Sequence, residues 1–195
     1  MAGEGPETLL LCEHDPVITL GRGGRAEHVL LPVSELGRRG ISLRRASRGG
    51  DVTYHGPGQL VGYPVFRLRH GLVAHMEAMA AAVVTLLARL GVHADWRRRH
   101  PGVWVGGDKI CALGVHVHRR VAIHGFALNV TTPLESFGAI VPCGLADAGV
   151  TSVAHILGAV PALEALAPEL AAAIARSFGL SLVSAGVGYI ESISA

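Results

Sequence analysis

Hydrophobic residues recur at three- and four-residue steps between Leu72 and Leu90, and this spacing predicts the clearest helix of the chain. Gly91 is suited to cap its C-terminal end. A second helix is expected over residues 161–178, with Pro168 bending or splitting it and Gly179 ending it. The first helix owes its apolar stripe to Met76, Met79, Val83, Leu86, Leu87 and Leu90, so its methionines are assigned to the core.

Shorter runs of aliphatic and β-branched residues predict strands. Residues 30–40 are expected to form a loop with a short helical piece, and residues 106–108 form a natural hairpin turn. Strands, a helix, more strands and another helix indicate one α+β domain over residues 1–195. The predicted strands cover residues 8–13, 17–20, 41–46, 60–68, 92–96, 103–105, 109–117, 121–124 and 126–130.

The composition argues against membrane-spanning, secreted and nucleic-acid-binding proteins. Half of the residues are hydrophobic and 16% are charged, but no uninterrupted apolar stretch approaches the roughly 20 residues that span a bilayer. Glu4 and Glu7 stand where a signal peptide would be basic, so a cytoplasmic protein without a membrane partner is expected. The net charge of +2 is too small to indicate nucleic acid, and the short arginine runs at 44–45 and 97–99 are typical of solvated surface. A slightly basic chain does suit an acidic protein partner.

Lys109 is the only lysine among 17 basic residues of the lysine and arginine type. Arginine stays charged at any working pH, whereas a buried lysine can change its pKa and exchange a proton. Chance is the plain alternative in a chain so biased towards arginine. Gln59 and Asn129 are also the only residues of their kinds, and all three lie in segments that look like sites of chemistry.

One segment is rich in glycine and in polar side chains: Arg48-Gly49-Gly50-Asp51-Val52-Thr53-Tyr54-His55-Gly56-Pro57-Gly58-Gln59. It contains too many breakers for a regular helix. Glycine allows the backbone to approach a ligand closely, and the polar residues between supply hydrogen-bond donors. The segment therefore suits an acyl or thioester ligand, although an ordinary surface loop has a similar composition. It lacks the GxxxxGK[ST] pattern of a phosphate-binding loop.

The three cysteines are expected to be free thiols, because their number is odd and no CxxC spacing is present. Cys12 lies in an apolar strand and fits a buried structural thiol. Cys111 is two residues from Lys109, so strand alternation places both on one face. Cys143 is flanked by Pro142 and Gly144, as a nucleophile on a loop would be. The residues alone leave the nucleophile open between Cys111 and Cys143, with the loop setting favouring Cys143.

Among 11 histidines, only His116 and His118 have a spacing typical of metal ligands, and His124 is the only nearby candidate for a third. No metal site is therefore predicted. The sequence also lacks a GxSxG serine motif.

Four linked motifs carry a family resemblance. They are the segment 48–59, the stretch Lys109-Ile110-Cys111-Ala112-Leu113-Gly114, the stretch His124-Gly125-Phe126-Ala127-Leu128-Asn129, and Pro142-Cys143-Gly144-Leu145. Together with the opening Glu13-His14-Asp15-Pro16-Val17-Ile18-Thr19-Leu20-Gly21, they resemble the lipoyl (octanoyl) transferases over nearly the whole chain. The resemblance implies a mixed, largely antiparallel sheet flanked by helices, similar to the catalytic domain of biotin and lipoate protein ligases.

The resemblance also implies a reaction. Members take octanoyl from octanoyl-acyl carrier protein and deliver it to a lysine of lipoyl domains, in 2-oxoacid dehydrogenases and in the glycine cleavage H protein, without a cofactor. By motif, Cys143 would be the nucleophile that forms the acyl thioester, and Lys109 its activating partner. The acyl site would be lined by Arg48, Gly49, Gly50, Asp51, Val52, Thr53, Tyr54, His55, Ala112, Leu113, Gly114, Gly125, Phe126 and Ala127.

The chain begins almost directly at the Glu13-His14 segment, whereas family members usually start with a further strand and helix. The sequence leaves two alternative functions. An ATP-dependent lipoate or biotin ligase would have the same fold but does not need the Cys143 motif. A non-catalytic module that binds acyl groups or carrier proteins would not need both Lys109 and Cys143.

Overall fold

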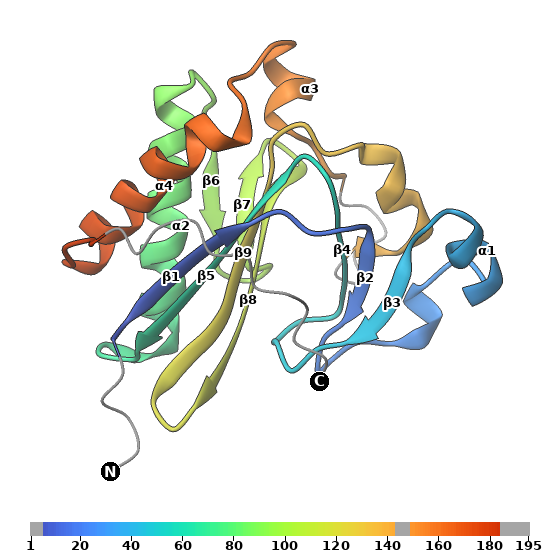
Figure 1. Cartoon of the computed structure of the whole chain (residues 1–195), viewed down its shortest axis with the longest axis horizontal. Helices are drawn as coiled ribbons and strands as arrows, with labels where there is room; N and C mark the ends of the chain where they lie inside the picture. The colour runs from blue at the N-terminus through green and yellow to red at the C-terminus, as the bar shows by residue number, and fades with distance from the viewer. Residues whose placement is uncertain (1–5, 143–148, 184–195) are drawn as a thin grey trace.

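A computed structural model describes residues 6–142 and 149–183. The larger of its two β-sheets is antiparallel throughout (Figure 1). Strands β6 to β9 are neighbours in chain order, whereas β5 pairs with β1 on one side and with β9 on the other. The order of the strands is β1 (Thr8–Cys12), β5 (Gln59–Arg67), β9 (Val121–Asn129), β8 (Asp108–His118), β7 (Gly102–Val105) and β6 (Asp95–Arg97).

A second, three-stranded sheet stands beside the first (Figure 1). Its central strand β2 (Val17–Leu20) pairs in parallel with β3 (Ser42–Arg45) and antiparallel with β4 (Val52–His55). Residues 56–58 connect β4 directly to β5 of the larger sheet, so the glycine-rich segment joins the two sheets. The short helix α1 (Val33–Arg38) lies next to β3, and two 3-10 helices, η1 (Ala26–His28) and η2 (Leu134–Ala139), complete this half.

Two long helices cover one face of the larger sheet. Helix α2 (Gly71–Arg89) packs on β6 to β9, and α4 (Leu163–Phe178) packs on α2 and on β1 and β5. By length and composition α2 could cross a membrane, but here one of its faces forms the core. Its buried residues are His75, Met79, Ala80, Ala82, Val83, Leu86 and Leu87.

The smaller sheet has an apolar core of its own. Ile18 on β2 and Val52 on β4 pack there with Leu36 of α1, and Phe137 of η2 closes the cluster. The remaining short helix, α3 (Val153–Leu157), begins at Ser152, whose side chain accepts a hydrogen bond from the His155 backbone. An oxygen at this position satisfies one of the amides that a helix start leaves unpaired.

The α+β class and the largely antiparallel sheet with flanking helices agree with the sequence prediction, as does the helix over 72–90. Three details differ. Residues 52–55 form a strand inside the glycine-rich segment, because they pair with β2. Residues 121–129 form one strand that runs through Gly125. Helix α4 is not split at Pro168, since buried Leu166 and Leu170 on either side hold it to the core.

Candidate active site

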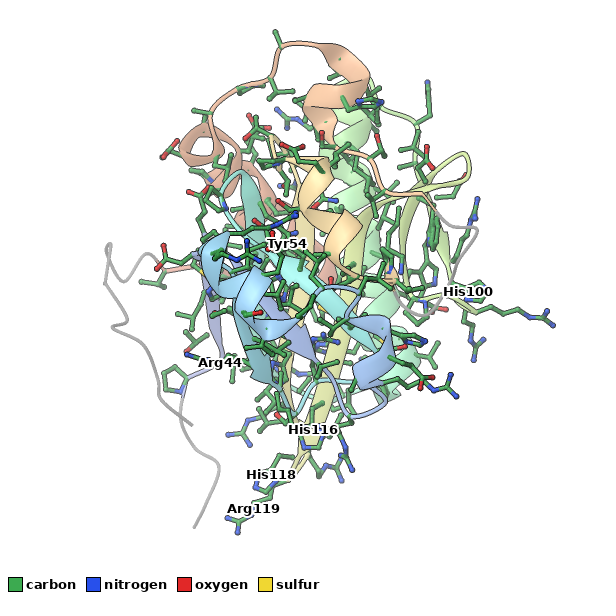
Figure 2. All side chains as sticks on the ribbon, turned by 90° about the vertical axis from the view of Figure 1, so that its right-hand side faces the viewer. Arg44, Tyr54, His100, His116, His118 and Arg119 are labelled. Atoms are coloured by element: carbon green, nitrogen blue, oxygen red, sulfur yellow. The ribbon has the colours of Figure 1, made fainter. Side chains whose placement is uncertain are left out.

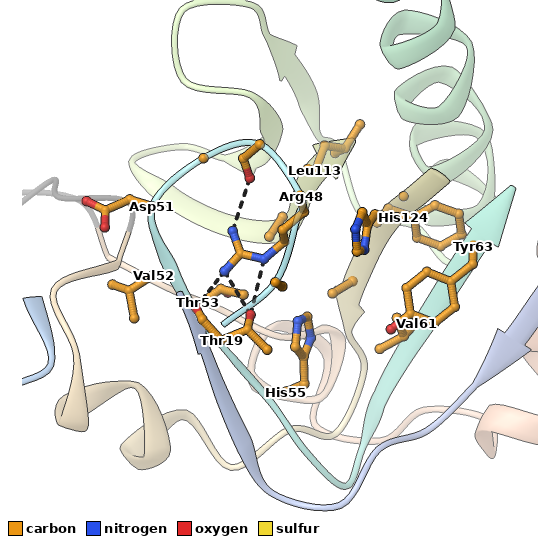
Figure 3. Close-up of a pocket in the computed structure, with 18 residues that line it drawn as sticks. Thr19, Arg48, Asp51, Val52, Thr53, His55, Val61, Tyr63, Leu113 and His124 are labelled. Atoms are coloured by element: carbon orange, nitrogen blue, oxygen red, sulfur yellow. Dashed lines mark hydrogen bonds between the residues drawn. The ribbon is translucent and has the colours of Figure 1, made fainter. Parts of the chain in front are cut away.

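A pocket lies where the glycine-rich segment meets β5, β8 and β9 (Figure 3). The residues expected from the sequence to contact an acyl group line it, with the exception of Tyr54. Backbone and small side chains from Gly49, Gly50, Ala112, Gly114 and Gly125 form much of its wall. Segments far apart in sequence therefore meet here as the resemblance led us to expect.

Tyr54 departs from the prediction. Its side chain is 2% exposed and belongs to the core of the smaller sheet, where its ring meets the ring of Phe137 edge to face at 5.5 Å. Alternation along β4 explains this, because Thr53 and His55 point to the opposite face, which lines the pocket. A residue predicted to contact the substrate thus serves the core.

Backbone hydrogen bonds hold the loop 48–51 on two sides. Arg22 and Gly23 donate to the carbonyls of Arg48 and Gly50, at 2.9 and 3.1 Å. On the other side Gly49 donates to Val115 of β8 at 2.9 Å. Gly50 has a φ of 83°, a conformation that glycine adopts without strain. These contacts fix the loop over β8, and a Cβ on Gly114 would lie 3.1 Å from the Gly49 carbonyl.

The Arg48 guanidinium is held mainly by Thr19 of β2 (Figure 3). Its Nη2 donates to the Thr19 carbonyl at 2.6 Å and to Thr19 Oγ1 at 2.8 Å, and Nη1 donates to the Gly49 carbonyl at 3.1 Å. This arrangement keeps a permanent positive charge at the pocket wall. The charge contributes to the low pKa values of His55 and His124, although burial is the larger cause for both.

Asp51 has a supporting role in the loop. One carboxylate oxygen accepts from the Arg25 backbone N–H at 3.0 Å, and the other forms a short contact with His28 Nδ1. The carboxylate therefore ties the pocket loop to η1. His28 also accepts, through its carbonyl, a 2.8 Å hydrogen bond from the Val141 backbone.

Two histidines, His55 of β4 and His124 of β9, line the pocket. The side chain of His55 is only partly accessible, and burial lowers its pKa from 6.5 to about 4. Its Nδ1 lies 2.7 Å from Gln59 Oε1. His124 has a φ of 63°, unusual for a residue other than glycine, and its Nε2 lies 2.8 Å from Ser47 Oγ. Burial also lowers the pKa of His124.

A third histidine, His14, contacts Tyr63 and lies close to His55. His14 Nε2 lies 2.6 Å from the Tyr63 hydroxyl, and the His14 ring is 5.8 Å from the ring of His55. Burial raises the pKa of the Tyr63 hydroxyl and lowers that of His14. Five further residues line the pocket that were not predicted to contact an acyl group: Thr19, Ala46, Val61, Tyr63 and His124. Of these, Thr19 and His124 lie in segments that carry the family resemblance.

Lys109 lies on β8, three residues before the pocket-lining stretch that starts at Ala112. Its side chain is 6% exposed, and Nζ lies 4.8 Å from the centre of the Trp104 ring. Gly102 leaves room for this side chain, since a Cβ there would come within 3.0 Å of Lys109 Cε. The lone lysine is therefore buried in a fitted position and is not a surface charge.

The predicted nucleophile, Cys143, lies outside the described residues, but both chain ends around it are placed. On one side, Val141 bonds to His28. On the other, the Lys109 N–H donates to the Gly149 carbonyl at 2.9 Å, and the Thr151 N–H donates to the Lys109 carbonyl at 3.0 Å. The segment that contains Cys143 thus ends beside Lys109.

The other two cysteines are placed unfavourably for nucleophilic attack. Cys111 is fully buried, and burial raises its pKa to about 12 although Lys109 acts in the opposite direction. Burial raises the pKa of Cys12 as well. A thiol must ionise to attack, so neither residue is activated in this structure.

Within residues 6–142 and 149–183, histidine, cysteine, aspartate and glutamate form no group of three or more that could hold a metal ion. His116 and His118 lie with Arg119 at the outer end of the β8–β9 hairpin (Figure 2). His116 Nδ1 is 3.2 Å from an Arg22 nitrogen, and His124 bonds to Ser47. His116 and His124 thus have different hydrogen-bond partners, although His116 is close enough to His124 to contribute to its lowered pKa, after burial and Arg48.

Residues 1–175 match the lipoyl protein ligase A/B catalytic domain. An octanoyltransferase of Porphyromonas gingivalis is 44% identical over 181 residues, which cover 88% of this chain and 37% of the relative. An octanoyltransferase of Koribacter versatilis is 42% identical over 196 residues, covering 96% of this chain and 76% of the relative. The chain thus spans about a third of the first relative and about three quarters of the second.

Solved structures show the same fold. Lipoate-protein ligase A bound with ATP superposes with a TM-score of 0.81 at 18% identity, covering 95% of this chain and 78% of that one. A bipartite lipoate protein ligase of Thermoplasma acidophilum, studied with its E2 lipoyl domain, has a TM-score of 0.78 at 20% identity, with 95% and 76% covered. These likenesses establish the architecture.

Proposed function

This chain belongs to the lipoyl protein ligase A/B catalytic domain family, and we propose that it is an octanoyltransferase that works through a thioester on Cys143. Octanoyl transfer in lipoate biosynthesis is the activity that its relatives support. The proposed donor is octanoyl-acyl carrier protein. The acceptor class is a lipoyl-domain protein, and we extend it to the lipoyl domains of 2-oxoacid dehydrogenases and to the glycine cleavage H protein.

The observation that carries this proposal is the backbone pairing of Lys109 with Gly149 and Thr151. It attaches the end of the Cys143 segment to the strand that bears the lone lysine, and that strand also forms a wall of the pocket. A cysteine nucleophile, a cation that can exchange protons and an acyl site are thereby expected in one neighbourhood. This is the combination that transfer through a thioester requires.

The pocket suits an acyl chain better than a nucleotide. Val61, Leu113, Phe126 and Ala127 give it apolar lining, and glycines let the backbone approach a ligand. The glycine-rich loop is not a phosphate-binding loop by sequence. We therefore assign the apolar wall to the octanoyl chain and the polar edge near Arg48 to the thioester end.

In the first step the Cys143 thiolate attacks the thioester carbonyl, forms a new carbon–sulfur bond and expels the carrier thiolate. Lys109, as an ammonium, stabilises the attacking thiolate and gives a proton to the departing sulfur. In the second step the acceptor amine attacks the Cys143 thioester, and Lys109 takes the proton that the amine loses. The Cys143 thiolate leaves and is regenerated. Thioester to thioester to amide is downhill, so no nucleotide is needed.

Intact-mass spectrometry after incubation with octanoyl-acyl carrier protein tests the proposal. One octanoyl group should be added, and peptide mapping should place it on Cys143. Adding a lipoyl domain, with EDTA and without ATP, should move the group to the domain. Cys143→Ala should abolish both steps, whereas Cys111→Ala is the matched control and should retain both.

The two alternatives give different results in the same assay. A strict requirement for ATP with free octanoate would identify a ligase. Binding of the octanoyl carrier protein without any transfer would identify a non-catalytic module. Either result would contradict the proposed function.

A further inference from the structure

A buried chain of side-chain hydrogen bonds runs from the pocket to the backbone beside Lys109. His55 Nδ1 lies 2.7 Å from Gln59 Oε1. Gln59 Nε2 donates to Asn129 Oδ1 at 2.9 Å, and Asn129 Nδ2 donates to the Thr151 carbonyl at 3.0 Å. We call this series of hydrogen bonds the relay, and it contains the only glutamine and the only asparagine of the sequence. Both amides are nearly inaccessible, at 2% and 4% exposure.

The direction of each bond follows from the chemistry of the groups. The Thr151 carbonyl can only accept, so the Asn129 amide nitrogen faces it and Asn129 Oδ1 is left to accept from Gln59. Gln59 Nε2 also donates to the Tyr54 carbonyl at 3.3 Å, which leaves Gln59 Oε1 as an acceptor. His55 Nδ1 must therefore carry the proton. The order of donors along the relay fixes one tautomer of the histidine.

That tautomer leaves Nε2 of His55 with a free lone pair. Figure 3 shows the ring reaching into the pocket towards His124, and among the described residues the hydrogen bonds of His55 use Nδ1 only. Its neighbours Arg48, His14 and His124 all oppose a positive charge on the ring, and so does its burial. The ring thus presents a neutral acceptor to whatever occupies the pocket.

We propose that Gln59 and Asn129 are positioning residues that keep the proton of His55 on Nδ1, so that Nε2 accepts a hydrogen bond from a bound N–H or S–H donor. Through Thr151, the same two amides align this acceptor with the strand of Lys109. The relay rests on the proposed function for the identity of the donor, namely the incoming amine or the thiol of Cys143. Its own geometry does not depend on that function.

Nitrogen-15 NMR of histidine-labelled protein tests the tautomer directly, with the His55 signal assigned from a His55→Gln variant. The wild-type signal should show protonated Nδ1 and unprotonated Nε2 between pH 5.5 and 8. Gln59→Met should abolish this preference and should lower kcat about 10- to 100-fold, the scale of one buried hydrogen bond, with KM within about threefold. Gln59→Glu keeps an oxygen acceptor for His55 and should restore the Nδ1 proton.

Asn129→Asp separates the two ends of the relay. It keeps an acceptor for Gln59 but sets an oxygen against the Thr151 carbonyl. Amide hydrogen exchange at Thr151 should therefore accelerate at least tenfold, while the His55 tautomer stays unchanged. Thr132→Val is the matched control, because it removes another buried hydrogen bond, to the Gly58 carbonyl, that lies outside the relay. It should alter neither the tautomer nor kcat.

Two results would overturn the proposal. One is a wild-type His55 signal with its proton on Nε2. The other is a folded Gln59→Met protein with normal tautomer and kcat. The NMR measurement of the tautomer does not depend on octanoyl transfer being the activity. Failure of the proposed function can therefore be distinguished from failure of the relay.

Discussion

The backbone N–H of Lys109 lies 2.9 Å from the carbonyl oxygen of Gly149 and donates a hydrogen bond to it. Thr151 returns a bond to the Lys109 carbonyl at 3.0 Å, and the two bonds form a short parallel bridge around Val150. A bridge of this kind fixes the C-terminal end of the segment that contains Cys143.

Cys143 should be the thiol that reacts fastest with iodoacetamide. Cys111 is buried and its pKa is raised to about 12, so only a minute fraction is thiolate at pH 7. We expect labelling of Cys143 at pH 7 to exceed that of Cys111 by at least 100-fold, as measured by peptide mass spectrometry over time. Unfolding in urea is the control and should bring the thiols to similar rates. Faster labelling of Cys111 in the folded protein would show that the nucleophile has been misassigned.

Lys109→Arg should keep the fold and lose about 10²–10⁴ in kcat, which is the usual contribution of acid–base catalysis. A guanidinium keeps the positive charge but cannot release a proton at working pH. The space between Trp104 and Gly102 also fits the narrow lysine side chain with its ammonium group. Steady-state transfer rates check this, with circular dichroism to confirm folding.

The same variant separates charge from proton transfer. The pH profile of Cys143 alkylation should remain close to that of the wild type, because a cation is still present. Since Lys109 is the only lysine, lysine-specific carbon-13 labelling also gives one side-chain signal whose titration can be followed directly. Near-normal turnover in Lys109→Arg would show that charge alone is sufficient.

Gly125→Ala should destabilise the protein by on the order of 3 kcal/mol, a typical cost of overpacking. A Cβ at this position would overlap the Gly62 carbonyl and approach Pro64 Cδ within 2.6 Å, so β5 and β9 would be pushed apart. Gly107→Ala is the matched control, since a Cβ there meets no atom within 4 Å. Its effect should stay within about 0.5 kcal/mol. Urea unfolding of both variants measures the difference, and equal midpoints would refute the steric explanation.

Acid should weaken the fold through His55. Its pKa falls from 6.5 in the unfolded chain to about 4 in the folded protein, so between these values the unfolded chain binds more protons. The contribution of neutral His55 to the free energy of unfolding is therefore fully present above pH 6.5. It is lost as the pH falls towards 4, by about 3 kcal/mol in all. His14, His75 and His124 act in the same direction, because burial lowers their pKa values too.

Urea unfolding at pH 7.5 and at pH 5 tests this dependence. His55→Gln should flatten it, because an uncharged amide replaces the titrating ring. A variant with the same loss of stability between the two pH values as the wild type would show that His55 is not the group responsible.

Much of the architecture could be predicted from the sequence because periodicity records burial. Helix α2 was readable from its apolar stripe, and β8 from its alternating residues. The pairing of β4 with β2 could not be predicted, because the glycines around residues 52–55 hide a strand whose partner strand is distant in sequence. Leu20 pairs with Val52, and Val17 pairs with His55. The continuity of α4 through Pro168 depends on tertiary packing and was likewise hidden.

The candidate site could be predicted where a motif supplied a signal and not elsewhere. Glycines at 49, 50, 114 and 125 met as expected, since close backbone approach leaves a trace in sequence. Tyr54 was misplaced because its β4 alternation was not recognised. Thr19 and Tyr63 were missed because their ordinary strand positions acquire meaning only from their partners Arg48 and His14.

The burial of the lone lysine has a consequence for side reactions. Thioesters acylate accessible amines slowly without any catalyst, and a protein that handles them turn after turn exposes its own surface to this damage. Here the other 16 residues of the lysine and arginine type are arginines, whose guanidinium groups stay protonated and are not acylated under these conditions. Lys109 itself is 6% exposed. In the proposed reaction, the side chains of this protein therefore offer the thioester almost no amine that competes with the acceptor lysine.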